Sequence, residues 1–327
     1  MNYKEFASDM PPEHSLEFTS AEESEEALLN LGFHQPVRQL GKGKFRYRIS
    51  VRSTDAAELG SDRFSAAVSL HLEPPADMLM LLFPRSVSGS FLACGNQTGN
   101  DKLIILPGGS GTDIVVPDLA GSEAIMIPKA RFIELTETIC AMPKSFRPER
   151  LTVIEGNTAQ LHALRREVVR HIANPESEDS REDLPNLVAA AIDWIGHSSG
   201  QWRPESLKGN ATPMHLAKMV QAYLEEHYRE SIRSEALCRL TGVSLRTVQR
   251  CFRQYFDQTI TDYLKTIRLD ATQRSLIAVH PSSTSVAEVA LRHGFTHLGR
   301  FSVHYREYYG ESPSETLDSR ADRNSYV

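Results

Sequence analysis

The chain has 327 residues, of which 40% are hydrophobic and 24% charged, and its formal net charge at pH 7 is −6. This length allows two domains, and this composition is typical of a soluble globular protein. The longest apolar run, at 78–83, is too short to span a membrane, and the N-terminus lacks the basic and apolar regions of a secretion signal. The four cysteines form no metal-binding pattern, so we expect reduced thiols in a cytoplasmic protein without a membrane partner.

Charge is distributed unevenly along the chain. Residues 1–211 contain 21 Lys and Arg against 29 Asp and Glu, whereas residues 212–327 contain 15 against 13. Within 233–310 the balance is 11 to 6, and nearly all of the positive charge is arginine. An acidic N-terminal part joined to a slightly basic C-terminal part indicates that the two have different partners.

We expect residues 1–35 to form an N-terminal arm and a short helix, followed by strands from about 36 to 128. In FRYRISVR (45–52) and AAVSLHL (66–72), apolar residues alternate with others, which is typical of half-buried strands. Short apolar runs follow at 78–83, 103–106, 113–116 and 124–127, with turn residues between them. Many short strands at regular spacing predict a β-barrel or a jelly-roll-like sandwich.

Helical periodicity replaces strand periodicity after this region. Three apolar stripes begin at Phe132, Leu161 and Leu187. The second stripe could form a dimer seam or pack on its own barrel, and the sequence leaves both open. It consists of Leu161, Leu164, Val168 and Ile172. The Gly, Ser, Pro and Asn residues at 198–212 predict an interdomain linker.

The rest of the chain is predicted to be helical and contains an internal repeat. LCRLTGVSLRTVQRCFRQYF (237–256) aligns with VALRHGFTHLGRFSVHYREYY (289–309), including the pairs Gly242-Val243 and Gly294-Phe295. Each copy has a short helix, a glycine able to adopt positive φ, and a longer helix, which is the pattern of a helix-turn-helix.

The second helix of each copy carries polar side chains suited to DNA. In the first copy Arg246, Gln249 and Arg250 share one face, and Arg and Gln can bridge the base edges of guanine and adenine. The second copy offers Arg300 on the corresponding face. Candidates for contacts with the DNA backbone lie at the helix starts and along the same faces. They are Ser244, Thr247, Arg253, Thr296, His297 and His304.

A predicted helix at about 260–279 separates the two copies. A helix of this length spans about 30 Å, close to the ~34 Å of one DNA turn. Two recognition helices, at about 244–256 and 297–309, could therefore enter successive major grooves of double-stranded DNA.

Residues 212–317 resemble the AraC/XylS-type transcription regulators. The resemblance rests on GVSLRTVQRCF, YLKTIRLDAT, SVAEVALRHGF and FSVHYREYYGESP, and it covers about a third of the chain. It implies that Arg246, Gln249 and Arg250 face the bases in the first copy. In the second copy the implied base-facing residues are Leu298, Gly299, Arg300 and Val303.

The second copy departs from the family pattern. Polar or basic residues are frequent where this chain has Leu298, Gly299 and Val303, so its base recognition is expected to be weak or to rest on apolar contact with thymine methyl groups. Asp257 also replaces the frequent glycine after the first recognition helix.

The resemblance implies an α+β protein of two domains. Residues 36–197 would form a cupin-like β-barrel with trailing helices, which senses an effector and dimerises. Residues 213–317 would form an all-α domain of two helix-turn-helix motifs joined by a long helix, and residues 318–327 would form a polar tail. Phe45, Tyr47 and Phe83 are candidates for an effector pocket, with core packing as the alternative.

The sequence therefore predicts a sequence-specific DNA-binding transcription regulator, effector-responsive and homodimeric, with RNA polymerase as a further candidate partner. We expect no cofactor, no metal and no enzymatic activity. His71 and Glu73 stand without a second nearby histidine, and PGGSGTD lacks the Lys and Ser/Thr of a phosphate-binding loop. The alternative is a cupin-like enzyme or small-molecule binding protein with a helical assembly domain.

Overall fold

The computed structural model describes residues 3–7, 10, 15–30, 35–54, 57–87, 89–109, 111–139, 148–174, 178–198, 211–280 and 283–323. The chain divides into two compact units. The first contains Met1–Gln39 and Phe45–Gly209, and the second contains Leu40–Lys44 and Asn210–Val327. Among the described residues, no helix is both long and apolar enough to cross a membrane.

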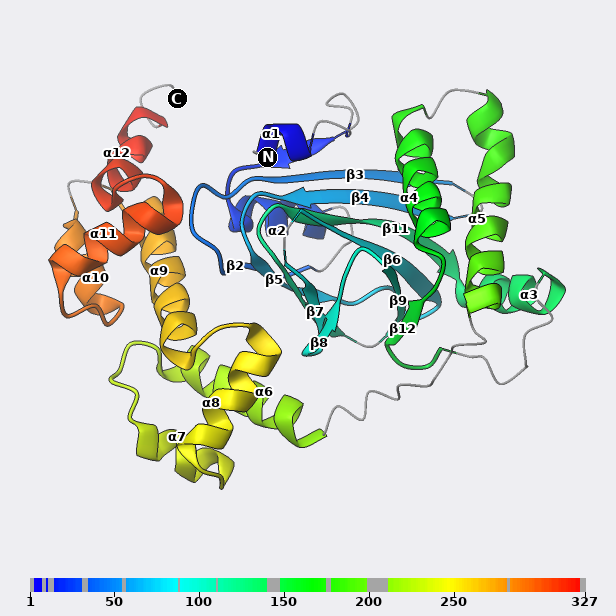
Figure 1. The fold of residues 1–327 in the computed structure, drawn as a ribbon. Helices are drawn as coiled ribbons and strands as arrows, with labels where there is room; N and C mark the ends of the chain where they lie inside the picture. The colour runs from blue at the N-terminus through cyan, green and yellow to red at the C-terminus, as the bar shows by residue number, and fades with distance from the viewer. Residues whose placement is uncertain are drawn as a thin grey trace. The chain divides into compact units, whose positions relative to one another are not determined.

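The first unit contains two antiparallel sheets (Figure 1). The larger has the order β1 (Leu16–Phe18), β3 (Tyr47–Ser53), β4 (Glu58–Phe64), β11 (Ala120–Pro128), β6 (Met78–Ser86), β9 (Lys102–Pro107) and β12 (Thr152–Glu155). The smaller has the order β2 (Val37–Gln39), β5 (Val68–Leu72), β10 (Thr112–Val116), β7 (Phe91–Ala93) and β8 (Asn96–Thr98). Together with the helical second unit, these sheets confirm the predicted α+β class.

Strand β4 was not among the predicted strands. Its sequence ELGSDRF carries polar and charged residues at most positions, so it has no apolar alternation. Even so, it pairs with β3 on one side and with β11 on the other, near the middle of the larger sheet. Its buried charges have partners inside the fold, as described below, and hydropathy alone could not predict this strand.

The two faces of the larger sheet contact different hydrophobic clusters, because successive side chains of a strand point to opposite faces. On β6, Leu81 and Phe83 belong to a cluster with residues of α3 (Lys129–Ile139), α4 (Thr158–Ala173) and α5 (Glu178–Ser198). Leu82 belongs to a cluster with residues of the smaller sheet and of α2 (Ala21–Asn30). One face is therefore covered by helices, and the other lies against the second sheet.

The N-terminal residues contribute to this unit. After α1 (Tyr3–Phe6), β1 pairs with β3 through the register Phe18↔Tyr47. Phe18 also packs near the Tyr47 ring, with the ring centroids 5.8 Å apart. The region predicted as an arm thus supplies an edge strand to the larger sheet.

The second unit is helical. It contains α6 (Ala211–His227), α7 (Ser234–Thr241), α8 (Leu245–Phe256), α9 (Ile260–Ala278), α10 (Val286–Arg292), α11 (Leu298–Tyr309) and α12 (Pro313–Arg323). Helix α9 joins a group formed by α6, α7 and α8 to a group formed by α10, α11 and α12 (Figure 1). Helix α12 continues past residue 318, the predicted start of the tail, and most of the predicted linker lies outside the described residues.

Candidate nucleic-acid interface

The first helix-turn-helix consists of α7, a short turn and α8. Helix α7 ends at Gly242, whose φ of 70° is left-handed and whose N–H donates to the Cys238 carbonyl. Ser244 begins α8, since its Oγ accepts a hydrogen bond from the Thr247 N–H at 3.3 Å. Glycine adopts the left-handed conformation of the turn without steric strain, and serine accepts a hydrogen bond from a free amide at the start of the helix. This short segment therefore fixes the direction of α8.

Helix α8 has strongly separated faces. Its inward side chains are buried, with Val248 1% and Phe252 0% exposed. Phe252 contacts Tyr263 of α9 edge-on, with the ring centroids 5.3 Å apart. The three predicted base-contacting residues lie on the exposed side, and their side chains make no hydrogen bond or ion pair with any described residue. These residues are Arg246, Gln249 and Arg250.

The second helix-turn-helix consists of α10, a longer turn and α11. Ser285 caps α10 by accepting from the Glu288 N–H at 3.2 Å, and Gly294 has a φ of 85°. His297 precedes α11 but makes no side-chain capping hydrogen bond. Inward residues of α11 such as Phe301 (1% exposed) and Tyr305 (0% exposed) pack in a common cluster.

The outward face of α11 is less polar than that of α8. Val303 is 57% exposed, Gly299 and Arg300 are exposed, and Leu298 packs partly against the cluster beneath. A β-carbon on Gly299 would meet nothing within 4 Å, and its φ is not left-handed. The fold of the chain therefore does not require glycine at this position.

The predicted backbone-contacting residues differ in their surroundings. Ser244, Arg253, Thr296 and His297 are exposed, and Thr247 is half-buried beside the Ser244 hydroxyl. His304 is half-buried, and its Nδ1 lies 3.9 Å from a carboxylate oxygen of Glu307. Glu307 adds a negative charge to α11 that has no counterpart on the exposed face of α8.

The two recognition helices lie in separate helix groups joined by α9. This helix has 19 residues, which corresponds to a length of about 30 Å. Thr259 caps its start by accepting from the Asp262 N–H at 3.1 Å. The second unit thus presents two exposed helix faces separated by a rigid helix that is nearly one DNA turn long.

A buried histidine holds the second helix-turn-helix to α9. His293 is 4% exposed, and its Nε2 lies 2.7 Å from the Ser275 hydroxyl of α9. Its Nδ1 lies 3.3 Å from the Tyr228 hydroxyl. Burial, and then the charges of Arg229 and Arg292, lower the pKa of His293, so its neutral form is favoured. Ser275, which interrupts the apolar face of the connecting helix, has a structural role in this contact.

The three predicted effector-pocket residues do not lie in one place. Phe45 and Tyr47 are buried in the cluster between the sheets, where Tyr47 stacks on Phe64 at a centroid distance of 4.2 Å. Phe83 is buried on the other face of the larger sheet, against the helices. The same helix-side cluster contains the entire stripe of α4, which consists of Leu161, Leu164, Val168 and Ile172.

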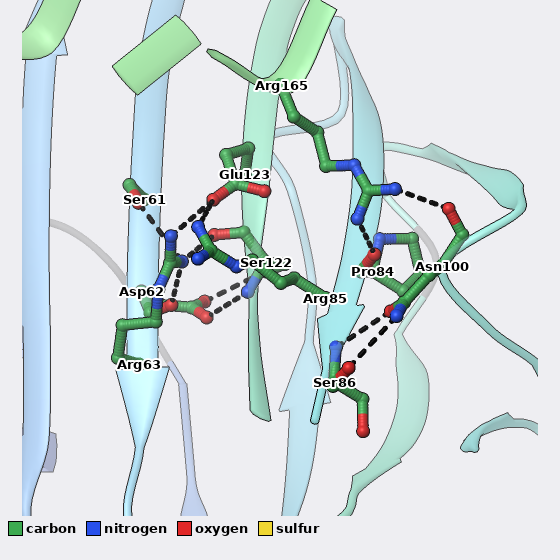
Figure 2. Close-up of polar contacts among 10 residues, drawn as sticks. All are labelled: Ser61, Asp62, Arg63, Pro84, Arg85, Ser86, Asn100, Ser122, Glu123 and Arg165. Carbon is green, nitrogen blue, oxygen red and sulfur yellow. Dashed lines mark hydrogen bonds and ion pairs between the residues drawn. The ribbon is translucent and has the colours of Figure 1, made fainter. Parts of the chain in front are cut away.

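A buried group of charges lies beneath α4 (Figure 2). Arg63 of β4 and Glu123 of β11 are both 0% exposed and form an ion pair of 2.6 Å. Arg165 of α4 donates to the backbone carbonyls of Pro84, at 2.8 Å, and of Asn100. The Arg165 contacts attach α4 to β6 and to the turn at Asn100, whereas the Arg63–Glu123 pair joins β4 to β11. The ion pair could not be predicted from the sequence, because the strand that carries Arg63 shows no apolar alternation.

His71 lies beside a carboxylate of a neighbouring strand. Its Nδ1 lies 2.8 Å from the Asp113 carboxylate of the neighbouring strand β10. Among the described residues, no group of three or more His, Cys, Asp or Glu is arranged to hold a metal ion.

Residues 237–319 match a protein family described as a helix-turn-helix domain. The chain is 35% identical over 102 residues to a probable thc operon regulatory protein of Rhodococcus erythropolis, which is 31% of each chain. It is 36% identical over 120 residues to the XylDLEGF operon transcriptional activator 2 of Pseudomonas putida, covering 37% of this chain and 74% of the relative.

A solved structure with the same type of domain comes from Rhodopseudomonas palustris and is described as a probable AraC family transcriptional regulator. It is 33% identical, with a TM-score of 0.31, and the match covers 32% of this chain and 96% of that one. The match with the first curated relative spans about a third of that relative's length. The chain belongs to the AraC family of transcriptional regulators.

Proposed function

We propose that this protein is a sequence-specific DNA-binding transcription regulator that contacts two successive major grooves with α8 and α11. One observation carries the proposal above all. The second unit has two helix-turn-helix motifs, each with an exposed recognition-helix face, at the two ends of the 19-residue helix α9. The spacing of one DNA turn allows both helices to contact one side of a duplex.

The chemistry of α8 suits direct base contact. Arginine donates two parallel hydrogen bonds to guanine O6 and N7, and glutamine pairs with adenine N6 and N7. Arg246, Gln249 and Arg250 are exposed and have no competing partner among the described residues. Ser244 and Thr247 lie at the helix start, where free backbone amides favour a phosphate.

The first unit would sense an effector and hold two copies together. The relatives named above are described as operon regulators and activators, which supports a regulatory and non-enzymatic role for this chain. An activator would also contact RNA polymerase. We place the protein in the cytoplasm, where such a regulator finds its DNA, and assign it no cofactor.

The test is selection of bound sequences from a random duplex library by the full-length protein at near-physiological salt. The expected result is enrichment of an asymmetric motif with two informative blocks about 10 bp apart. The affinity for the enriched duplex should fall steeply with salt, because phosphate contacts release counterions. If no sequence is enriched and affinity does not depend on salt, the proposal is wrong.

A further inference from the structure

A small cavity lies between the two sheets of the first unit. Its volume is about 80 Å³, and it is lined by residues of β3, β4, β5, β6 and β11 together with α2. Gly60 and Ala124 face each other in the register of β4 and β11, and a β-carbon on Gly60 would be 3.7 Å from that of Ala124. Small side chains at these paired positions leave space that larger ones would fill.

One carboxylate in this cavity is held in a fixed position. Asp62 accepts hydrogen bonds from the Ser122 backbone N–H at 2.6 Å and from the Ser122 hydroxyl at 3.0 Å (Figure 2). Burial raises the pKa of Asp62 to about 6, and the nearby charge of Arg63 opposes this rise. The ionised form is therefore present at neutral pH, but it is poorly solvated.

The basic residue next to Asp62 in the sequence lies on the other side of the sheet. Arg63 is the next residue of β4, so its side chain points to the opposite face, where it is paired with Glu123 at 2.6 Å. No Lys, Arg or His is among the described residues that line the cavity, whereas a second carboxylate, that of Glu58, is. The site therefore favours a positive charge and disfavours an anion.

The remaining walls are mainly apolar. They include Ile49, Leu72, Met80 and Leu82. Since one water needs roughly 10–15 Å³ of such volume, the cavity accommodates a molecule of about six non-hydrogen atoms. A fitting ligand has one compact cationic group and a short hydrocarbon part.

We propose that this cavity binds a small aliphatic primary amine, with its ammonium group on Asp62 and its hydrocarbon chain against Ile49, Met80 and Leu82. Each carboxylate oxygen of Asp62 already accepts one hydrogen bond from Ser122, and the ammonium donates to the remaining lone pairs of these oxygens. The role of this amine as the effector rests on the proposed regulator function, but its binding does not.

The test is isothermal titration calorimetry of the full-length protein with three probes of similar size: n-pentylamine, pentan-1-ol and butanoate. We expect saturable binding of the amine at least about tenfold tighter than of the alcohol, as a hydrogen-bonded charge pair provides, and no binding of butanoate. Asp62→Asn should abolish this preference and leave the weak binding of the alcohol unchanged. Asp101→Asn, which removes an exposed carboxylate, is the matched control and should bind like wild type.

A second variant keeps the test decisive if Asp62→Asn does not fold. Ala124→Met fills the cavity with an apolar side chain and should abolish the binding of both the amine and the alcohol. Equal affinity of the wild type for amine and alcohol, a preference for the amine that survives Asp62→Asn, amine binding that survives Ala124→Met, or absence of amine binding would overturn the proposal.

The effector role is tested separately, by DNA affinity of the full-length protein with and without pentylamine. A change in affinity with wild type but not with Asp62→Asn supports that role, and an unchanged affinity overturns it. Failure to bind any DNA would contradict the proposed function and leave the calorimetric result intact.

Discussion

The two helix-turn-helix motifs share one backbone plan but differ in how they are held and in what they expose. Each has a left-handed glycine in its turn and a recognition helix whose inward aromatic side chain packs on an aromatic residue outside the helix. In the first, Ser244 caps α8, and the exposed face carries Arg246, Gln249 and Arg250. In the second, α11 has no side-chain cap, and the predicted base-facing residues are Arg300 with Leu298, Gly299 and Val303.

This difference shows that the packing that holds a recognition helix and the side chains that the helix exposes vary independently. The second motif has specific internal polar contacts, such as His293 with Ser275 at 2.7 Å and Tyr305 with Thr316 at 2.8 Å. Its outer face nevertheless has fewer groups able to hydrogen-bond a base edge. A well-determined helix position therefore does not imply strong base recognition, and the following changes separate these two properties.

The largest expected effect comes from the turn glycines. Gly294→Ala places a β-carbon in the left-handed region and 2.8 Å from the Arg229 carbonyl oxygen, so it should destabilise the domain by about 2–5 kcal/mol. Gly242→Ala meets nothing within 4 Å and should cost only the left-handed strain, about 1–2 kcal/mol. Urea unfolding followed by circular dichroism measures both, and equal costs would contradict the difference in packing.

The next effect is on DNA affinity. Arg250→Ala should weaken binding to the selected duplex by about 1–3 kcal/mol and relax specificity at the base it contacts. Arg274→Ala, which removes an exposed arginine of α9 outside both recognition faces, is the control for net charge. Fluorescence anisotropy at constant salt gives both affinities. If the two variants lost the same affinity for every sequence, Arg250 would not be a base contact.

A smaller effect concerns the helix caps. Ser244→Ala removes the hydrogen bond to the Thr247 N–H and should cost about 1 kcal/mol of stability. His297→Ala removes no capping hydrogen bond, so its cost should be close to zero. Urea unfolding measures both losses of stability as shifts of the denaturation midpoint, provided that the slope of the free energy against urea is unchanged. A loss of stability for His297→Ala as large as that for Ser244→Ala would show that α11 is capped in another way.

The smallest effect is on Gly299. Because a β-carbon there meets no described residue within 4 Å, Gly299→Ala should stabilise α11 by about 0.5–1 kcal/mol through its helix propensity. If glycine allows α11 to approach the DNA closely, the same variant should bind its duplex more weakly despite its higher stability. Thermal unfolding measures the stability and fluorescence anisotropy the DNA affinity of one preparation. An unchanged DNA affinity would show that Gly299 does not contact the DNA.

The sequence predicted the parts of the fold that depend on local patterns. The repeat, the turn glycines and α9 follow from helical periodicity and positive-φ residues, and the strand at 78–83 follows from its apolar run. Strand β4 could not be predicted, because Asp62 and Arg63 are stabilised by partners on β11 that are distant in sequence. For the same reason the sequence predicts neither the cavity at Asp62 nor the position of Phe83 on the opposite face of the sheet from Phe45 and Tyr47.

The most direct test of tandem recognition is a map of base preference for wild type, Arg250→Ala and Arg300→Ala. The affinity of each full-length protein is measured for every single-base variant of the selected duplex. Arg250→Ala should reduce discrimination in only one block of the motif, and Arg300→Ala should affect only the other block, about 10 bp away and more weakly. Changes at the same positions with both variants, or a uniform loss over all sequences, would contradict recognition by two separate helices.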